Sequence, residues 1–356
     1  MDLPGFALYL MVLVTLLGTH LGSCMGHEHS SRSFIAWEDM RWEDQWRRLR
    51  LDDGHNVSQV IIVNKDGRGD SNTVQGAVDL VPDHNSKRVK ILIPPGIYRE
   101  KVYVPSNKPY ISFIGNPNSE TVITWNDKAS NKDANGREMG TRNSASVTVA
   151  SDYFCATGIT FENTIVANGG RGMQSVALRI FGDKAMFYKV RFVGAQDTLL
   201  DQEGTHYFYH CFIQGTVDFI FGNGRSLYED CILHSTAKRS GAIAASKRDS
   251  EDDNTGFSFV NCTVNGTGRI YLGRAWGRYS RAIYSYCNIS DIIRPPGWSE
   301  WGDSSKRQTA VFAEYQCIGR GANLKGRASW AKSFSHEEAR PFLDRDFIDG
   351  NQWLRL

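Results

Sequence analysis

The hydrophobic pattern from residue 60 onward consists of short apolar runs separated by turn-forming residues. The runs are rich in β-branched and aromatic residues, and the first of them cover 60–63, 89–93, 110–114 and 122–125. Gly, Asn and Asp cluster between the runs, as they do over 66–70. Short runs of this composition, bounded by turn residues, are typical of β-strands. The pattern therefore predicts a chain that is rich in strands.

One stretch near the N-terminus has a different period. Within 73–80, Val74, Ala77 and Val78 recur at the spacing of one helical face, and Pro82 follows the last apolar position. This combination favours a short amphipathic helix that ends before the proline. It is the one convincing helix that the sequence predicts in this region.

A short unit recurs through the middle of the chain. It consists of a polar residue, then a small or apolar residue, then any residue, and finally an apolar residue. Its copies are separated by 31, 21, 20, 31 and 25 residues, and they cover 158–161, 189–192, 210–213, 230–233, 261–264 and 286–289. Self-similarity at such a period, without helical stretches between the copies, indicates a solenoid of stacked coils. A β-sandwich would also give many short strands. We favour an all-β, single-stranded parallel β-helix, because one position of the unit repeatedly carries cysteine.

That position holds Cys211, Cys231, Cys262 and Cys287. Strands in neighbouring coils lie roughly 4.8 Å apart, and a disulfide requires Cα atoms roughly 4.4–6.8 Å apart. The four residues are therefore expected either to form disulfides or to remain a column of small buried hydrophobic side chains. The sequence leaves both alternatives open.

Composition narrows the class of protein and the compartment. The chain has 356 residues, 41% of them hydrophobic, and its 41 Lys and Arg nearly balance 39 Asp and Glu, which argues against a nucleic-acid-binding protein. A 12-residue apolar run over 6–17 has the length of a signal-peptide core, although the usual basic residues before it are missing. No later run is long enough to span a membrane. Glycosylation sequons, which fit a secreted protein, occur at Asn56, Asn261, Asn265 and Asn288.

These observations divide the chain into three parts. Residues 1–25 are predicted to be a signal peptide, whose removal leaves an even six cysteines, a number suited to an oxidising compartment. Residues 26–57 are polar and rich in Trp, and we interpret them as an extended or partly helical arm over the main body, with a free amphipathic helix as the alternative. Residues 58–356 are expected to form the catalytic β-helix.

Two apolar stretches, 194–200 and 215–222, each contain a single carboxylate. Asp197 and Asp218 lie 21 residues apart, close to the period of the repeat, so stacking of coils would make them neighbours. Two carboxylates in a partly desolvated site titrate as a coupled pair, in which one keeps its proton while the other is ionised. The pair would then offer an acid and a nucleophile in one site. The alternative is that both are structural Asp residues in turns.

Five stretches in order along the chain resemble the plant pectin methylesterases, or pectinesterases, a family of carbohydrate esterases. These are 96–100, 174–179, the two Asp stretches and 272–277, and the resemblance runs from about Val60 to Leu354. The chain is too short to include the long inhibitor-like pro-region of many relatives, so it resembles the group without that region. Two positions depart from the family pattern: Ala275 replaces the usual Pro, and Leu200 replaces the usual aromatic residue.

The resemblance implies a right-handed β-helix that removes methyl groups from the galacturonate esters of pectin and releases methanol, without a metal or other cofactor. It assigns roles to seven residues: Asp218 as nucleophile, Asp197 as general acid and later base, Gln196 and Gln174 as oxyanion donors, and Arg274, Trp276 and Thr141 as substrate-binding residues. Around Thr141 the motif has drifted. The implied partner is methyl-esterified homogalacturonan, and a proteinaceous inhibitor is a further candidate. The protein is expected to be a monomer that is secreted to the cell wall. It is expected to bind no nucleic acid and, once the signal peptide is removed, no membrane.

Other readings of these residues remain. Arg274 could be a structural ion-pair partner, and the two Gln residues could form a stacking ladder. Trp276, Trp298 and Trp301 could be packing residues. His206 and His210 are expected on the surface or in the core rather than at a metal. The sequence lacks Gly-x-Ser-x-Gly, His-Glu-x-x-His and Cys-x-x-Cys motifs, which argues against a serine esterase or a zinc site. A pectin-cleaving β-helix enzyme and a catalytically silent wall protein are the rival functions.

Overall fold

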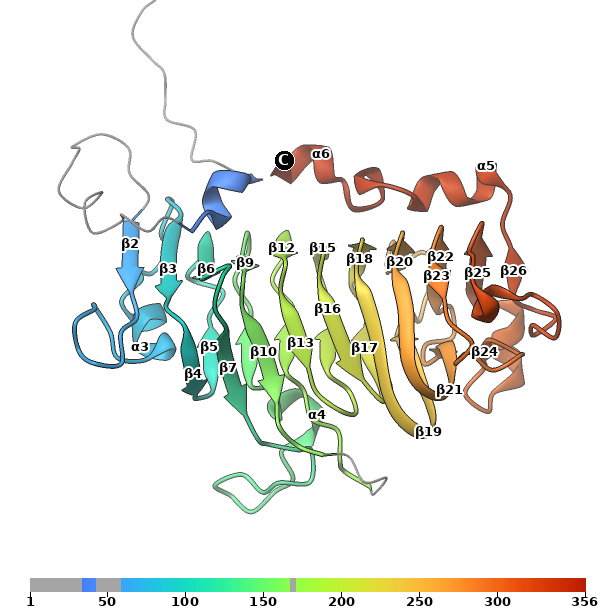
Figure 1. The fold of residues 1–356 in the computed structure, drawn as a ribbon, viewed down its shortest axis with the longest axis horizontal. Coiled ribbons are helices and arrows are strands. Elements are labelled where there is room, and N and C mark those ends of the chain that lie inside the picture. Colours follow the sequence, from blue (N-terminus) through green and yellow to red (C-terminus); the bar gives the residue numbers. More distant parts are fainter. Residues whose placement is uncertain (1–33, 43–58, 167–170) are drawn as a thin grey trace, which may run out of the picture. The chain divides into compact units, whose positions relative to one another are not determined.

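The computed structural model describes residues 34–42, 59–166 and 171–356. The predicted signal peptide, 1–25, lies outside these residues, as does most of the predicted arm. The described strands form a right-handed parallel β-helix, which confirms the predicted fold (Figure 1). No helix in the described residues has the length and apolar character needed to cross a membrane.

The first sheet, called sheet I here, has 11 parallel strands in the described residues. They are β2 (Gln59–Ile62), β3 (Val89–Ile93), β6 (Ile111–Gly115), β9 (Cys155–Thr157), β12 (Ala185–Tyr188), β15 (Thr205–Tyr209), β18 (Arg225–Glu229), β20 (Gly256–Val260), β22 (Arg281–Ser285), β25 (Val311–Tyr315) and β26 (Lys332–Ser333). Each strand pairs in register with the strands of the preceding and following coils.

The second sheet, sheet II, has 14 described strands and two faces. One face contains β4 (Gly96–Arg99), β7 (Thr121–Trp125), β10 (Thr160–Asn163), β13 (Arg191–Val193) and β16 (Phe212–Gly215), and the other contains β5 (Val102–Val104), β8 (Val147–Val149), β11 (Leu178–Ile180), β14 (Leu199–Asp201) and β17 (Val217–Gly222). The long strands β19 (Ile232–Ser246) and β21 (Thr263–Ala275) join the faces, because β19 pairs with both β16 and β17. The short strands β23 (Asn288–Ile289) and β24 (Trp298–Ser299) pair with β21.

The repeated unit of the sequence begins at the turn that leaves sheet I. Its first residue has a left-handed backbone in each copy, with φ between 52° and 63° at Gly158, Lys189, His210, Asp230, Asn261 and Tyr286. Gln316, with φ 46°, occupies the corresponding position after β25 and reveals a seventh copy. A non-Gly residue in this region of φ is uncommon, so the repeat records a turn that recurs once per coil.

The interior cysteines form a column of free thiols rather than disulfides. In Cys211, Cys231, Cys262 and Cys287 the Sγ donates to a backbone carbonyl of the preceding coil at 3.3–3.4 Å, and Cys317 extends the series at 3.3 Å. The accepting carbonyls belong to aromatic residues that stack on one another at centroid distances of 4.4–4.9 Å: Phe187, Phe208, Tyr228, Phe259 and Tyr284. Of the two alternatives for the cysteines, the structure therefore has the column of small buried side chains.

The predicted helix is α3 (Val74–Asp79), which buries Val74, Ala77 and Val78. The Thr73 side chain accepts a hydrogen bond from the Gly76 amide at 3.0 Å and caps its first turn. The described residues contain three further four-residue helices that the sequence did not predict: α4 (Gly140–Asn143), α5 (His336–Ala339) and α6 (Gly350–Trp353). Single-turn elements of 3₁₀ type are η1 (Trp37–Met40), η2 (Ser304–Gln308), η3 (Arg320–Ala322), η4 (Arg340–Phe342) and η5 (Arg345–Ile348).

The C-terminal segment runs back past the ends of the sheet I strands, across the top of the view in Figure 1. It ends in β27 (Leu354–Arg355), which pairs in parallel with β1 (Ile35–Ala36). A buried apolar cluster that includes Met40, Tyr207 and Trp353 joins these segments to sheet I. The two described ends of the chain are thereby joined to each other and to the β-helix.

Candidate active site

The two carboxylates singled out in the sequence occupy equivalent positions in successive coils. Leu199 of β14 pairs with Ile220 of β17, and Asp197 and Asp218 each lie two residues before their member of this pair. Both have left-handed backbones, with φ 66° at Asp197 and 48° at Asp218. Asp adopts this conformation more readily than most residues, because its short polar side chain can bond locally. Coil stacking thus brings the two carboxylates into one site.

This site is a pocket of about 810 Å³, called the central pocket here. Its lining includes all seven residues to which the family resemblance assigned a role: Thr141, Gln174, Gln196, Asp197, Asp218, Arg274 and Trp276. Both carboxylates are largely removed from solvent, with exposed fractions of 8% for Asp197 and 5% for Asp218. Such burial makes the charged form of each carboxylate costly unless it has a partner.

Asp218 has such a partner in Arg274 of β21. The Arg274 Nε donates to Asp218 Oδ1 at 2.9 Å and its Nη2 donates to Oδ2, so the guanidinium holds the carboxylate at two points. Burial raises the pKa of Asp218, and the hydrogen bonds and charge of Arg274 oppose that rise. The guanidinium therefore favours the ionised carboxylate, which is the form that can act as a nucleophile.

Asp197 has a different environment. Burial raises its pKa well above the usual value for an aspartic acid, and the negative charge of Asp218 raises it further. Arg274 and a hydrogen bond with Gln196 act in the opposite direction. Because two neighbouring carboxylates cannot both ionise easily, the pair is able to hold one proton on Asp197 beside an ionised Asp218.

Gln174 and Gln196 lie on adjacent coils at the edge of the central pocket. The Ser175 amide donates to the Gln196 carbonyl at 3.0 Å, which fixes the two stretches relative to each other. The side-chain Oε1 of Gln174 is buried without a hydrogen-bond partner among the described residues. Neutral side-chain NH₂ groups at this position can stabilise negative charge that develops on a bound ester.

Aromatic side chains line the pocket next to the carboxylates. The Trp276 ring packs against Phe221 at a centroid distance of 6.1 Å, and the Lys247 Nζ lies 5.5 Å from the Trp276 ring centre. The Trp301 ring, 39% exposed, lies 3.8 Å below the Arg274 guanidinium. Trp298 is instead a packing residue, 2% exposed in the core. The two tryptophans that the sequence left undecided thus have different places, and Trp301 belongs to the pocket.

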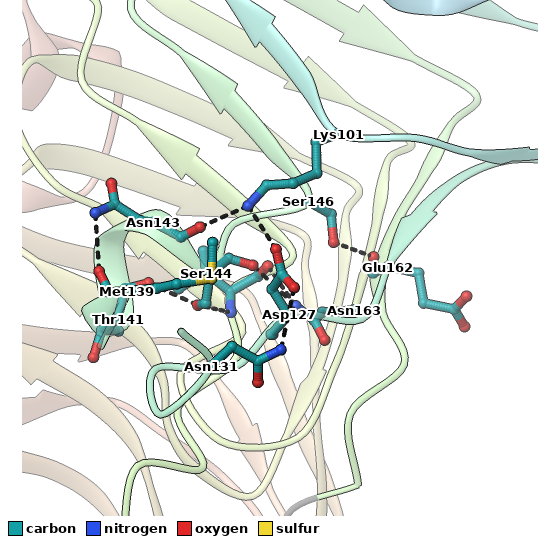
Figure 2. A network of polar contacts seen from close by, with 11 residues as sticks. Lys101, Asp127, Asn131, Met139, Thr141, Asn143, Ser144, Ser146, Glu162 and Asn163 are labelled. Carbon is teal, nitrogen blue, oxygen red and sulfur yellow. Dashed lines mark hydrogen bonds and ion pairs between the residues drawn. The ribbon is translucent and has the colours of Figure 1, made fainter. Parts of the chain in front are cut away.

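The pocket wall that contains Thr141 comes from a long loop that ends in α4 (Figure 2). The Lys101 Nζ donates to Asp127 Oδ2 at 2.8 Å and to the Asn143 carbonyl at 2.7 Å. The side-chain Nδ2 of the buried Asn163 donates to the backbone carbonyls of Asp127 and Ser144 at 2.9 and 3.2 Å. These contacts tie both ends of the loop to the β-helix and fix α4 at the edge of the pocket.

His206 and His210 lie in the core and on the surface, the two kinds of place that the sequence predicted. His210 is exposed on a turn, whereas His206 is fully buried and contacts Asp201 Oδ1 through Nδ1 at 2.5 Å and the Gly182 carbonyl through Nε2 at 2.9 Å. Tyr228 donates to the second oxygen of Asp201 at 2.6 Å. Among the described residues, no group of three or more His, Cys, Asp or Glu side chains is arranged to hold a metal ion.

Comparison with known proteins gives a consistent result. A family model described as pectinesterase matches residues 60–351. Pectinesterase QRT1 of Arabidopsis thaliana is 54% identical in an alignment that covers 99% of this chain and 98% of that protein. Among solved structures, the pectin methylesterase from carrot matches with a TM-score of 0.77 at 34% identity, over 85% of this chain and 96% of that one. The pectin methylesterase from Aspergillus niger matches with a TM-score of 0.71 at 28% identity, over 85% and 98%.

Proposed function

The chain belongs to the pectinesterase family, and from that premise we propose that Asp218 is its nucleophile and Asp197 its acid–base group. The protein is a pectin methylesterase, so its reaction converts a methyl ester of pectin into a carboxylate and methanol. The observation that carries the proposal is the pair of stacked, buried carboxylates in the central pocket, of which one is held by a guanidinium.

The first half of the reaction forms an acyl-enzyme. One carboxylate oxygen of Asp218 attacks the ester carbonyl carbon, and the carbonyl oxygen gains negative charge. Collapse of this tetrahedral species breaks the bond to the methoxy group, which takes the proton of Asp197 and leaves as methanol. The raised pKa of Asp197 supports its role as the proton donor, because the group keeps its proton in the free enzyme.

The second half releases the product. A water molecule attacks the carbonyl carbon of the mixed anhydride and transfers a proton to Asp197, which now acts as a base. The bond between substrate and Asp218 breaks, so that Asp218 is again ionised and Asp197 is again protonated. The same two groups therefore serve both steps, and the net change is hydrolysis of one ester.

Gln174 and Gln196 are proposed to donate hydrogen bonds to the carbonyl oxygen in both tetrahedral species. Their side chains are neutral, so they stabilise the oxyanion without competing with Arg274 for the Asp218 carboxylate. Losing one such donor in other enzymes costs about 2.7–4 kcal/mol of transition-state stabilisation. The supporting observation is the position of both residues on the lining of the central pocket.

The proposed substrate is methyl-esterified homogalacturonan, which would lie along the pocket with sugar rings against Trp276. Arg274 and Thr141 complete the proposed substrate contacts. We also propose that the protein is secreted to the cell wall, with 1–25 as its leader and 58–356 as its catalytic domain. Family membership supports this location, since pectinesterases act on the cell wall.

Methanol release from highly methylated pectin tests the proposal. The Asp218→Asn variant is expected to lose activity by a factor of about 10⁴ or more, because a neutral amide cannot form the acyl-enzyme. Its thermal transition should stay close to that of the wild type. Asp249→Asn, which removes an exposed carboxylate from the edge of the same pocket, serves as the matched control. Retained activity in Asp218→Asn would remove Asp218 from the mechanism.

The same assay separates the rival functions. A pectin-cleaving enzyme would shorten the polymer without releasing methanol, and a silent wall protein would do neither. We expect methanol release at constant chain length, which size-exclusion chromatography of the treated pectin would reveal.

A further inference from the structure

Outside the lining of the central pocket lies a buried ion pair between Glu314 of β25 and Arg327. The Arg327 Nε donates to Glu314 Oε1 at 2.6 Å and its Nη2 donates to Oε2 at 3.0 Å. The two side chains are only 4% and 8% exposed. Burying two charges is costly unless geometry and further hydrogen bonds compensate for the lost solvation, so this pair calls for an explanation.

The ion pair holds the indole of Trp298. Its Nε1 donates to Glu314 Oε1 at 3.3 Å, and its ring stacks on Phe312 at a centroid distance of 4.6 Å and 24°. A Cβ atom at Gly273 would lie 3.0 Å from the indole, so the ring packs directly against the backbone of the residue before Arg274. The charge of Glu314 is thereby connected to β21 through a single rigid side chain.

Arg327 holds the chain that leads into the same strand. Its Nη1 donates to the Pro295 carbonyl at 3.2 Å, and its Nη2 also donates to the Gly321 carbonyl. The turn that follows Pro295 delivers Trp298 and Ser299 to β24, in register with Gly273 and Arg274 of β21. One guanidinium therefore fixes the chain that leads into β24.

β24 in turn fixes the side of the pocket that holds Arg274. The Trp301 amide donates to Ser299 Oγ at 3.2 Å, and the Trp301 ring supports the Arg274 guanidinium at 3.8 Å. That guanidinium has its two-point contact with Asp218. The contacts are continuous from Arg327 to Glu314, Trp298, β24, Trp301 and Arg274.

We infer that Glu314 and Arg327 are positioning residues that set the geometry of the Arg274–Asp218 contact from outside the pocket lining. The inference rests on the proposed role of Asp218 as nucleophile. Neither residue touches the reacting atoms, so their effect is on the orientation of Arg274. When that orientation is lost, the guanidinium stabilises the ionised form of Asp218 less well.

The predicted signature is therefore a pH effect and not only a loss of stability. Asp218 faces two charged or titratable groups, Arg274 from β21 and Asp197 from the preceding coil. A weaker contact with Arg274 raises the pKa of Asp218, and the rising limb of kcat/KM with pH then moves to higher pH. Because the contact acts on the nucleophile, kcat should fall by about tenfold, and a rise in KM would report the substrate contact that Arg274 is also proposed to make.

Arg327→Met, Glu314→Gln and the double variant test this inference in the methanol-release assay, at temperatures below the thermal transition of each variant. Glu314→Gln keeps the side-chain volume and an acceptor for the Trp298 indole, and it provides the test should Arg327→Met fail to fold. The double variant removes both buried charges, so its thermal midpoint is expected to recover relative to Arg327→Met. The rising limb of kcat/KM with pH should remain shifted to higher pH in the double variant, by about half a pH unit or more.

Arg88→Met is the matched control, because Arg88 forms a similarly buried ion pair with Asp39, with exposed fractions of 7% and 5%, outside the central pocket. It should lower the thermal midpoint without moving the rising limb. An unshifted limb in folded Glu314→Gln and in the double variant would overturn the inference. That result is distinct from failure of the proposed mechanism, which retained activity in Asp218→Asn would reveal.

Discussion

Asp197 and Asp218 stack in successive coils, and both have the left-handed backbone that most residues avoid. Asn tolerates this conformation about as well as Asp, whereas Ala would add backbone strain to the loss of the carboxylate. Asn substitutions at the two positions therefore change the chemistry of the side chain at little conformational cost.

Asp197→Asn should lower kcat by a factor of about 10²–10⁴, because the departing methoxide loses its proton donor. The free energy of unfolding should rise at neutral pH. The folded wild type keeps a proton on Asp197 that the unfolded chain has lost, so its free energy of unfolding falls as pH rises above the ordinary pKa of an aspartic acid. The neutral amide of the Asn variant does not titrate, so the variant avoids this loss of stability. Methanol release and urea unfolding at pH 7 measure the two effects. A variant with full kcat would exclude Asp197 as the proton donor.

The pH dependence of kcat/KM should be bell-shaped. The proposed mechanism requires one ionised and one protonated carboxylate, so activity should rise as the pair loses its first proton and fall as it loses its second. The falling limb should lie far above the ordinary range of an aspartic acid, because burial and the charge of Asp218 raise the pKa of Asp197. Initial rates across the pH range, at substrate concentrations below KM, give the profile. A profile whose activity falls off at the pH of an ordinary aspartic acid would contradict the assignment.

Gln196→Leu and Gln174→Leu should each reduce kcat by about 10²–10³-fold, with smaller changes in KM, because the lost donor acts mainly in the transition state. Gln202→Leu is the control, since Gln202 also lines the pocket but bonds to Arg179 at 2.8 Å rather than lying beside the carboxylates. Equal losses in all three variants would indicate a general disturbance of the pocket instead of oxyanion stabilisation.

His206 should make stability depend on pH. Burial disfavours the imidazolium, but the Asp201 carboxylate and the acceptors at both ring nitrogens outweigh it and raise the pKa of His206 above 6.5. Its stabilising contribution is therefore complete below about pH 6.5 and is lost as pH rises through the raised folded value. Urea unfolding should show a steeper loss of stability with rising pH in the wild type than in His206→Asn. His210→Asn, at an exposed turn, should retain the wild-type slope.

The thiol column should be measurable by alkylation without reductant. The five stacked cysteines and Cys155 are free, so all six should react after denaturation. In the native protein the buried thiols should be protected, namely those of Cys155, Cys211, Cys231, Cys262 and Cys287. Cys317, which is partly exposed, should react first. Mass spectrometry of the alkylated chain counts the modified residues. Two unlabelled cysteines in the denatured, unreduced protein would reveal a disulfide and contradict the column.

Features set by repetition could be predicted from the sequence. The parallel β-helix followed from a unit whose first residue occupies a left-handed turn in every coil, and α3 followed from its apolar face. The last copy of the unit does not fit the pattern in the sequence, because Gly319 follows Cys317-Ile318 where an apolar residue is expected. The helices α4, α5 and α6 have four residues each, too few to show a period.

Contacts set by the register of distant strands could not be predicted. Trp301 lies beneath Arg274 because β24 pairs with β21, and no local pattern around Trp301 indicates that pairing. The buried pair of His206 and Asp201 spans the turn between two strands of different sheets. Asp197 and Asp218 could be singled out from their apolar stretches and their spacing, whereas the roles of the other five candidate residues follow from the family resemblance. The fold then accounts for why residues so far apart in sequence line one pocket.

The pairing of β1 with β27 also has a mechanical consequence. A force applied between Phe34 and the C-terminus acts on this two-residue pair before it reaches any coil. The parallel strands would be sheared, which loads their hydrogen bonds together, so a first rupture event should precede the peeling of coils in a single-molecule pulling trace. Truncation after Trp353 should abolish that first event and leave the later ones in place.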